Sequence, residues 1–383
     1  MSKNISFENL LNKNVKEINY KDLVSLSNLN DDEASNFFEY ISKCSLTEIL
    51  EIMNKLVQIN QQESYLEYES IFKKFLSYPN DIIKISCMKG LSESEDRKLI
   101  NIFVEIMLEG ESLELRNQAA KVLIGFSFRA FEKKLINSDS TLIFDSLFRI
   151  ISNVNEPISL RMNALESISI FNHESIDEYI LYAWNSEDFY SKRSSIVSMG
   201  LSGDIKWTNY VIKDLSHEEP KIRCEASKSL GIIGTENELF HLEKLLEDED
   251  LNVQLSTITS IQNIGGDKAL NLLEKSLLSP EPLVVEQSKL SIQIIKEEQN
   301  LDLVVTPEMA QNLYGSSDIQ PGIDLEGYDP LEINFDEINT TFSESNDFGT
   351  GITEEAEELG LDRGDPFDID LLPEDLFDYD EDN

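Results

Sequence analysis

Apolar residues recur through the middle of this chain at a period of about 31 residues. In segment 220–234 a small residue, Ala226, stands three places after Arg223, and a large aliphatic residue, Leu230, stands seven places after it. Spacings of three, four and seven place residues on one face of an α-helix. The position of Arg223 recurs along the chain at Lys84, Arg116, Arg161, Lys192, Arg223, Gln254 and Val285, and the last five positions are 31 residues apart. The period predicts a series of helix pairs.

Neighbouring pairs must stack, because one helix pair cannot bury its apolar face alone. We therefore expect an all-α fold, an α-solenoid, with seven units between about residues 80 and 299. The first helix of each unit carries the small-then-large pattern. The second is richer in large aliphatic residues, as in segments 99–107, 142–151, 176–184, 239–246 and 270–278. The step from Arg116 to Arg161 is longer, at 45 residues, which predicts an insertion around 126–140 that lengthens a loop or a helix.

Residues 1–79 show helical spacing that falls out of the repeat register. Segments 32–42, 46–59 and 65–76 are the expected helices. The second has apolar residues at Leu46, Ile49, Leu50, Met53, Leu56 and Val57. A terminal unit must close the apolar end of a solenoid with a polar outer face. We expect residues 1–79 to form a helical N-terminal cap.

The composition changes after Gln299. Thr306, Pro307 and Glu308 resemble the start of a helix, since threonine suits an N-cap and proline the first turn. We expect a short capping helix or linker over 300–315. Residues 316–383 are rich in glycine, proline, serine and acids, which predicts a disordered acidic tail. Its apolar residues come in bursts, and we expect five of them to contact a partner: Phe367, Leu371, Leu372, Phe377 and Tyr379.

The charge of the chain limits its partners. The formal net charge is −41, and residues 300–383 supply 25 Asp and Glu against the single base Arg363. Such acidity opposes binding to nucleic acid and to anionic membranes, and favours protein partners with a basic surface. The N-terminus lacks a secretory pattern, and no stretch reaches the ~18 apolar residues of a membrane span. The three cysteines, Cys44, Cys87 and Cys224, are far apart and odd in number. These features favour a reduced, cytoplasmic location.

The series of units resembles HEAT repeats, specifically the short bacterial type also found in phycobilin lyases, over residues 80–298. The resemblance implies a stack of antiparallel helix pairs with the second helices on the concave side. A related helical-repeat enzyme, the di-iron deoxyhypusine hydroxylase, carries paired His-Glu dipeptides in its first helices. Here His173-Glu174 and His217-Glu218 fall in turns, and Cys224 stands next to Arg223 where that family would place a histidine. We expect no metal site, no cofactor and no catalytic residue.

Five aromatic residues on two successive second helices form a further candidate site: Tyr179, Tyr182, Trp184, Trp207 and Tyr210. Rings at helical spacing either fill a core or line a pocket, and the sequence leaves both open. The leading hypothesis is a non-catalytic scaffold or adaptor that binds protein through the solenoid groove and the acidic tail. The alternative is a phycobilin-lyase-like accessory protein that handles a bound chromophore or cofactor. A third hypothesis is that the tail folds back onto its own groove.

Overall fold

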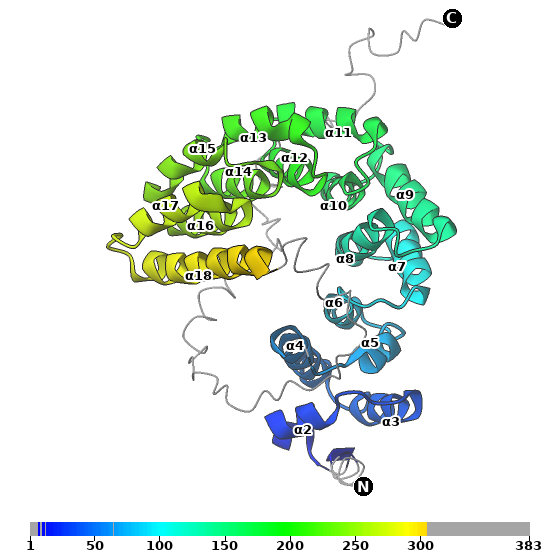
Figure 1. The fold of residues 1–383 in the computed structure, drawn as a ribbon. Helices are drawn as coiled ribbons and strands as arrows, with labels where there is room; N and C mark the ends of the chain where they lie inside the picture. The colour runs from blue at the N-terminus through cyan, green and yellow to red at the C-terminus, as the bar shows by residue number, and fades with distance from the viewer. Residues whose placement is uncertain (1–6, 8–9, 12, 64, 305–383) are drawn as a thin grey trace, which may run out of the picture. The chain divides into compact units, whose positions relative to one another are not determined.

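The repeats fold as helix pairs along the whole of the described chain (Figure 1). The structure is a computed structural model and describes residues 7, 10–11, 13–63 and 65–304. Within these ranges it contains helices and no strand. The helices are η1 (Val15–Glu17), α2 (Tyr20–Ser25), α3 (Asp31–Ile41), α4 (Leu46–Gln62), α5 (Glu69–Phe75), α6 (Asp81–Gly90), α7 (Lys98–Glu109), α8 (Leu113–Phe131), α9 (Asn137–Ile151), α10 (Ile158–Ser169), α11 (Glu174–Asn185), α12 (Phe189–Leu201), η2 (Ile205–Trp207), α13 (Thr208–Asp214), α14 (Pro220–Ile233), α15 (Leu239–Glu243), η3 (Lys244–Glu247), α16 (Leu251–Ile264), α17 (Gly266–Ser276) and α18 (Pro282–Val304).

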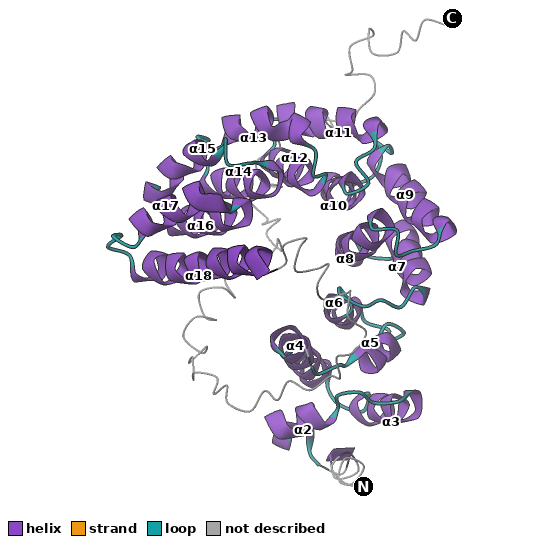
Figure 2. Ribbon diagram, viewed as in Figure 1, coloured by secondary structure: helices purple, strands orange, loops and turns teal. Residues whose placement is uncertain are grey.

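The helices form two layers, joined by short turns (Figure 2). The first helices of the units, α6, α8, α10, α12, α14 and α16, pack side by side, each on the next. The second helices, α7, α9, α11, α13, α15 with η3, and α17, form the other layer and pack on the first. The predicted all-α solenoid of stacked helix pairs is confirmed.

Polar side chains before the helices fix where several first helices begin. Asn80 Oδ1 accepts a hydrogen bond of 3.0 Å from the amide of Ile82 at the start of α6. Asp250 Oδ1 accepts one of 2.8 Å from the amide of Asn252 at the start of α16. These bonds satisfy amide groups that have no partner inside the helix. Helix α14 begins instead at Pro220, which has no amide hydrogen to satisfy.

The first helices of the predicted units form the more closely packed layer, and each of α7, α9, α11 and α13 packs chiefly on the first helix of the next unit, so the packed pairs are shifted by one helix from the predicted units. Each of α6 to α16 lies close to the next first helix, whereas the backbones of α9, α11 and α13 lie farther apart, with aromatic side chains between them. In a curved double layer the closer-spaced layer lies on the inner side. The first helices, not the second, therefore lie on the inner side of the curvature between these units.

Small residues make this close approach of the first helices possible. A Cβ atom on Gly231 of α14 would lie 2.7 Å from Ser260 Cα of α16. Buried hydroxyl groups bridge other first helices of this layer, since Ser229 Oγ of α14 donates to the Ile196 carbonyl of α12 at 2.8 Å and Ser167 Oγ of α10 to the Ala120 carbonyl of α8 at 2.6 Å. The small residues therefore serve contacts between neighbouring units and not only contacts within a helix pair.

The N-terminal helices continue the hydrophobic core of the repeats. Helices α3, α4 and α5 correspond to the three predicted segments, although α5 begins at Glu69 and not at residue 65. One cluster of buried apolar residues runs from Phe7 to Ile295. The predicted insertion lengthens α8 to 19 residues and α9 to 15.

The C-terminal end differs from the expected boundary. Helix α18 continues past Gln299 to Val304, so no break in the helix follows the change in composition. Residues up to Ile295 belong to one compact unit, and the last turns of α18 to a second. The predicted helix start at Thr306, the acidic tail and the five apolar tail residues, Phe367, Leu371, Leu372, Phe377 and Tyr379, lie outside the described residues.

Candidate interaction surface on the first helices

The basic residues that mark the repeat register hold the units together. Arg223 is 7% exposed and binds Asp248 through two nitrogens, Nε at 2.8 Å and Nη2 at 2.7 Å. Its Nη1 donates to the carbonyl groups of His217 and Glu218, each at 2.9 Å. One guanidinium thus connects the turn before α14 to the turn before α16. Such a bidentate pair is strong and directional.

Other units repeat this arrangement. Arg116 Nη2 lies 2.7 Å from Glu156 Oε1, and its Nε donates to the Met107 carbonyl at 2.8 Å. Lys192 Nζ lies 3.1 Å from Asp214 Oδ1. Arg161, at the same register position, is fully buried. These cations are structural, so a binding surface must be sought among the remaining charges.

Charge is unevenly divided between the two layers. Helices α6, α8, α10, α12, α14 and α16 together carry eleven Lys and Arg and four Asp and Glu. Helices α7, α9, α11, α13, α15, η3 and α17 together carry six Lys and Arg and twelve Asp and Glu. In a chain with a net charge of −41, the first helices are a net positive layer.

Six charged side chains form a continuous row across α6, α8, α10, α12 and α14, which we call the charged row: Lys89, Lys121, Glu166, Arg193, Glu225 and Lys228. Arg193 links two helices, with Nη1 3.7 Å from Glu166 Oε1 and Nη2 3.2 Å from Glu225 Oε1. Lys228 Nζ lies 3.6 Å from the same oxygen of Glu225. The row contains four cations and two carboxylates, and Lys89 and Lys228 are exposed.

Electrostatic effects show that members of the row lie close together. Burial lowers the pKa of Lys121, the charge of Glu166 opposes this, and the charges of Arg193 and Lys89 lower it further. Burial raises the pKa of Glu166, against the effects of Arg193 and of a 2.6 Å hydrogen bond from Ser194 Oγ. These charges therefore interact across neighbouring units.

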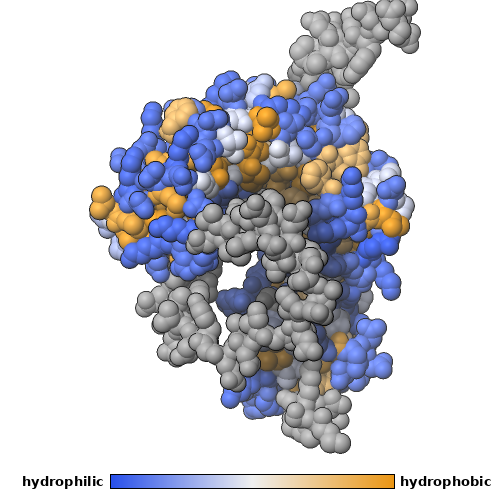
Figure 3. Space-filling model, in the orientation of Figure 1, coloured by the Kyte–Doolittle hydropathy of each residue, from blue (hydrophilic) through white to orange (hydrophobic). Residues whose placement is uncertain are grey.

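Apolar side chains lie beside the charged row on the same helices. Ile124 and Phe128 follow Lys121 by three and seven residues on α8, and Ile232 follows Lys228 by four residues on α14. These spacings place each on the helix face of its lysine. Phe128 is 40% exposed and Ile232 is 55% exposed. On α12, Val197 and Leu201 follow Arg193 by four and eight residues, and both are half-buried. We call Ile124, Phe128, Val197, Leu201 and Ile232 the apolar row. On the viewed face of the molecule, hydrophobic side chains likewise form separate patches among hydrophilic ones (Figure 3).

The structure brings three of the five aromatic candidates together in the second layer. The ring of Tyr210 lies 5.0 Å from that of Trp184 and 5.6 Å from that of Trp207, centroid to centroid, with edge-to-face geometry. Trp207 is 3% exposed. Trp184 Nε1 donates to Asp214 Oδ2 at 2.6 Å, and Lys192 Nζ lies 3.8 Å above the Trp184 ring.

Tyr179 and Tyr182 lie on the same helix α11 as Trp184, and both are half-buried. The ring of Tyr179 packs edge-on against Phe148 of α9, with centroids 5.9 Å apart. Tyr179, Trp184, Trp207 and Tyr210 thus contact other rings of the second layer, and Tyr182 packs partly buried against the core. A role for any of them in partner binding stays a prediction.

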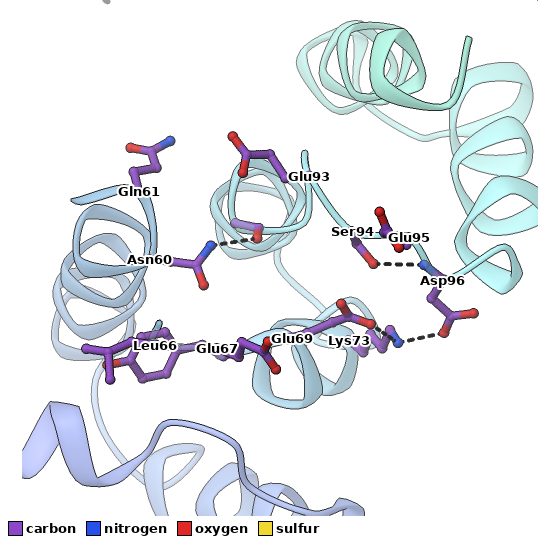
Figure 4. Close-up of a pocket in the computed structure, with 12 residues that line it drawn as sticks. Asn60, Gln61, Leu66, Glu67, Glu69, Lys73, Glu93, Ser94, Glu95 and Asp96 are labelled. Atoms are coloured by element: carbon purple, nitrogen blue, oxygen red, sulfur yellow. Dashed lines mark hydrogen bonds and ion pairs between the residues drawn. The ribbon is translucent and has the colours of Figure 1, made fainter. Parts of the chain in front are cut away.

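An open cleft of about 670 Å³ lies between the ends of α4 and α6 and helix α5 (Figure 4). Its lining includes Glu67, Glu69, Glu93 and Glu95. Lys73 bridges Glu69 and Asp96, with Nζ 2.6 Å from Asp96 Oδ2, and this contact holds the pKa of Asp96 below its ordinary value. Small-molecule sites are mostly apolar with a few converging polar groups. This cleft has the opposite character, and none of the five aromatic candidates lines it.

His173 and His217 lie outside the helices, in the turns before α11 and α14, as the sequence predicts. His173 precedes α11, where its Nδ1 accepts a hydrogen bond of 3.2 Å from the Ser175 amide. His217 lies between α13 and α14, and its Nδ1 accepts one of 3.0 Å from the Glu219 amide. Among the described residues no group of three or more His, Cys, Asp and Glu side chains is arranged to hold a metal ion. In the same part of the chain, no helix combines the length and the apolar character needed to cross a membrane.

We expect the purified protein to contain no stoichiometric iron or zinc, because the ligands that such ions prefer do not converge in the described chain. Elemental analysis after purification without chelator tests this directly. One or two equivalents of iron per chain would contradict it and would revive an enzymatic role.

A scan against protein-family models matches residues 215–293, which span α14 to about the middle of α18, to the family described as HEAT repeats. Residues 215–293 are HEAT repeats. A search of curated proteins finds no match. The matched residues include Arg223, Leu230 and both helices of the α14–α16 contact. The finer resemblance to phycobilin lyases stays a prediction.

Several solved helical-repeat structures are similar to this chain at low identity. An engineered protein is 16% identical, with 52% of this chain and 96% of that chain covered and a TM-score of 0.35. Human deoxyhypusine hydroxylase in complex with glycerol is 10% identical, with coverages of 78% and 98% and a TM-score of 0.31. Kap121p bound to Nup53p is 14% identical, with coverages of 79% and 37% and a TM-score of 0.36. Such scores carry nothing about activity or partner.

The charged row was not predicted from the sequence. Its residues were visible in the sequence, since Lys89, Lys121, Glu166 and Lys228 all stand five places after the register position of their units. Overall net charge hid this pattern, because the acids of the tail and the second layer outnumber the cations of the first helices.

Proposed function

We propose that this protein is a non-catalytic interaction scaffold whose first helices bind an acidic, partly apolar segment of a protein partner. The observation that supports this most directly is the charged row beside the apolar row, on a net positive layer of a strongly acidic chain. Repeat arrays of this type offer extended surfaces, and opposite charge guides the partner to them.

The range of electrostatic forces limits the kind of partner. Charges separated by more than about 8 Å are largely screened at physiological salt. A partner segment in contact with Lys89 and Lys228 would therefore experience mainly the charged row and not the distant acids. A large partner with an acidic surface would also come close to the acidic second layer and turns, which would repel it. The proposed ligand is accordingly a short acidic segment with apolar side chains that reach Phe128 and Ile232.

The acidic tail is a second binding element in this proposal. With 25 acids against one base in residues 300–383, it suits a partner with a basic surface. Two linked contacts raise the overall affinity through effective concentration, so neither has to be tight alone. The protein would then connect an acidic segment on its first helices with a basic partner on its tail.

We expect the double variant Lys89→Glu, Lys228→Glu to lose its partner, with recovery reduced by about tenfold, since both lysines are exposed and each reversal replaces attraction by repulsion. Tagged full-length protein would be used to capture partners from a cell extract, with each captured protein quantified by mass spectrometry. The matched control is Lys244→Glu, Lys268→Glu, which makes the same change of charge at exposed positions of the second layer.

The informative proteins are those captured by wild type and by the control but not by the first-helix variant. Circular dichroism would show that both variants keep wild-type helix content. If both variants lose the same proteins equally, net charge and not the first-helix surface determines binding, and the proposal fails. If neither variant loses any captured protein, the first helices are not the binding surface.

A further inference from the structure

We propose that residues 365–382 of this chain occupy the first-helix surface in the absence of a partner, so that the protein covers its own binding surface. This inference rests on the proposed function of the charged row and the apolar row. It adds an identified ligand and a regulatory consequence.

Charge complementarity is the first argument. Residues 365–382 contain nine Asp and Glu and no Lys or Arg. The charged row offers four cations against two carboxylates, and both carboxylates already pair with Arg193. Lys89 and Lys228 stand at the two ends of the row and are exposed. Among the described helices, the first layer is the one with an excess of positive charge.

The order of residues in the segment is the second argument. Acids alternate with large apolar residues over Phe367–Tyr379. The two rows on the first helices lie within about one helical turn of each other, since Ile124 follows Lys121 by three residues and Ile232 follows Lys228 by four. A segment that lies along the boundary between the rows has cations on one side and apolar side chains on the other. Both kinds of its residues therefore find complementary contacts.

The length of the connecting chain is the third argument. Helix α18 ends at Val304, and residues 305–364 lead to the segment. These residues reach roughly 200 Å when extended, so the connection does not prevent docking. Linkage within one chain gives effective concentrations on the order of 1 mM. A segment with an intrinsic Kd of about 100 μM would then occupy its site about nine-tenths of the time.

The consequence is competition between the segment and the partner. An acidic partner must displace the segment before it binds. The apparent affinity of the partner is therefore its intrinsic affinity multiplied by the fraction of chains whose first-helix surface is free. Under the numbers above, removal of the segment strengthens partner binding by about tenfold. A basic protein that captures the tail would have the same effect, and would thereby couple the two binding elements of the scaffold.

The experiment uses full-length protein and a fluorescent peptide with the sequence of residues 365–382. In one variant the five apolar residues of the segment become serine and every acid is kept: Phe367→Ser, Leu371→Ser, Leu372→Ser, Phe377→Ser and Tyr379→Ser. We expect this variant to bind the peptide about tenfold more tightly than wild type, because its own segment no longer competes. A matched control replaces four apolar residues outside the segment by serine, at Ile333, Phe335, Ile338 and Phe342, and should bind the peptide as wild type does.

A cross-linking measurement locates the contact in the intact chain. A photoreactive benzoylphenylalanine replaces Phe377, and cross-linked peptides are identified by mass spectrometry at low protein concentration. We expect intramolecular cross-links to α8, α12 or α14. Adding Lys89→Glu, Lys228→Glu should remove these cross-links and abolish peptide binding by the serine variant.

Different outcomes distinguish this inference from the proposed function. Equal peptide affinity of wild type and the serine variant would mean that the segment does not cover the surface. Cross-links confined to the second helices, or formed between chains, would also overturn the inference. The proposed function would survive each of these outcomes if Lys89→Glu, Lys228→Glu still loses a captured partner that the second-layer control keeps. If the first-helix variant and the second-layer control also capture the same partners equally well, both proposals fail.

Discussion

Leu230→Ala should lower the free energy of unfolding by about 2–5 kcal/mol, the usual range for truncation of a buried leucine. Leu230 is fully buried in α14, seven residues after Arg223, where the repeat places its large aliphatic residue. The substitution removes apolar contacts and leaves a cavity that the tightly packed first helices fill only in part. Urea unfolding of the full-length protein, followed by circular dichroism, measures the loss.

The matched control is Ile232→Ala on the same helix. Ile232 is 55% exposed, so its truncation should change the free energy of unfolding by no more than about 0.5 kcal/mol. Equal losses in the two variants would mean that α14 has a different face toward the core. The stability of a solenoid depends on contacts between neighbouring units, so hydrogen exchange should show faster opening of α12 and α16 than of α4 in the Leu230→Ala variant.

The repeat register could be predicted from the sequence because it reflects local helix geometry and burial. Ala226 and Leu230 are both fully buried, as their spacing from Arg223 requires for one helix face. The N-terminal helices could be placed for the same reason, although α5 begins four residues later than expected.

The choice of the inner layer could not be predicted from periodicity alone. Both layers show helical spacing, and curvature depends on how closely neighbouring units approach. The decisive residues are small ones such as Gly231 and Ser260, whose contact joins α14 to α16. From the sequence alone, these small residues are expected to allow close packing of the second helix of the same unit. Only the packing of successive first helices shows which neighbour they accommodate.

The candidate surface was missed for an electrostatic reason. A net charge of −41 predicts basic partners. That prediction holds for every surface of the protein only if the charge is evenly spread. Lys121 and Glu166 lie 45 residues apart in sequence, and they become neighbours only when α8 and α10 pack together. The prediction of a basic partner therefore applies to the tail, whereas the first helices favour an acidic one.

Arg223→Ala should be the most destabilising single substitution proposed here, with a loss of about 3–5 kcal/mol at pH 7. It leaves Asp248, whose side chain is 8% exposed, without its bidentate partner. It also removes the donor to the His217 and Glu218 carbonyl groups. Arg223→Lys keeps the charge but cannot bind Asp248 through two parallel nitrogens, so it should lose an intermediate amount.

The pH dependence of this loss separates the ion pair from simple packing. Burial alone would raise the pKa of Asp248, but hydrogen bonds from Arg223 and the Asp250 amide hold that pKa below its ordinary value. A lowered folded-state pKa stabilises the fold above the unfolded-state pKa of about 3.9, and this contribution is lost as pH falls through the folded-state value. In Arg223→Ala the hydrogen bonds from Arg223 are lost, so the pKa of Asp248 is lowered less and this contribution to stability shrinks. The difference in unfolding free energy between wild type and Arg223→Ala should therefore be largest near pH 7 and narrow mainly as the pH falls below about 4, through the folded-state pKa of Asp248 in the wild type. Urea titrations at several pH values measure it, and a constant difference would show that Arg223 stabilises the fold through packing and not through Asp248.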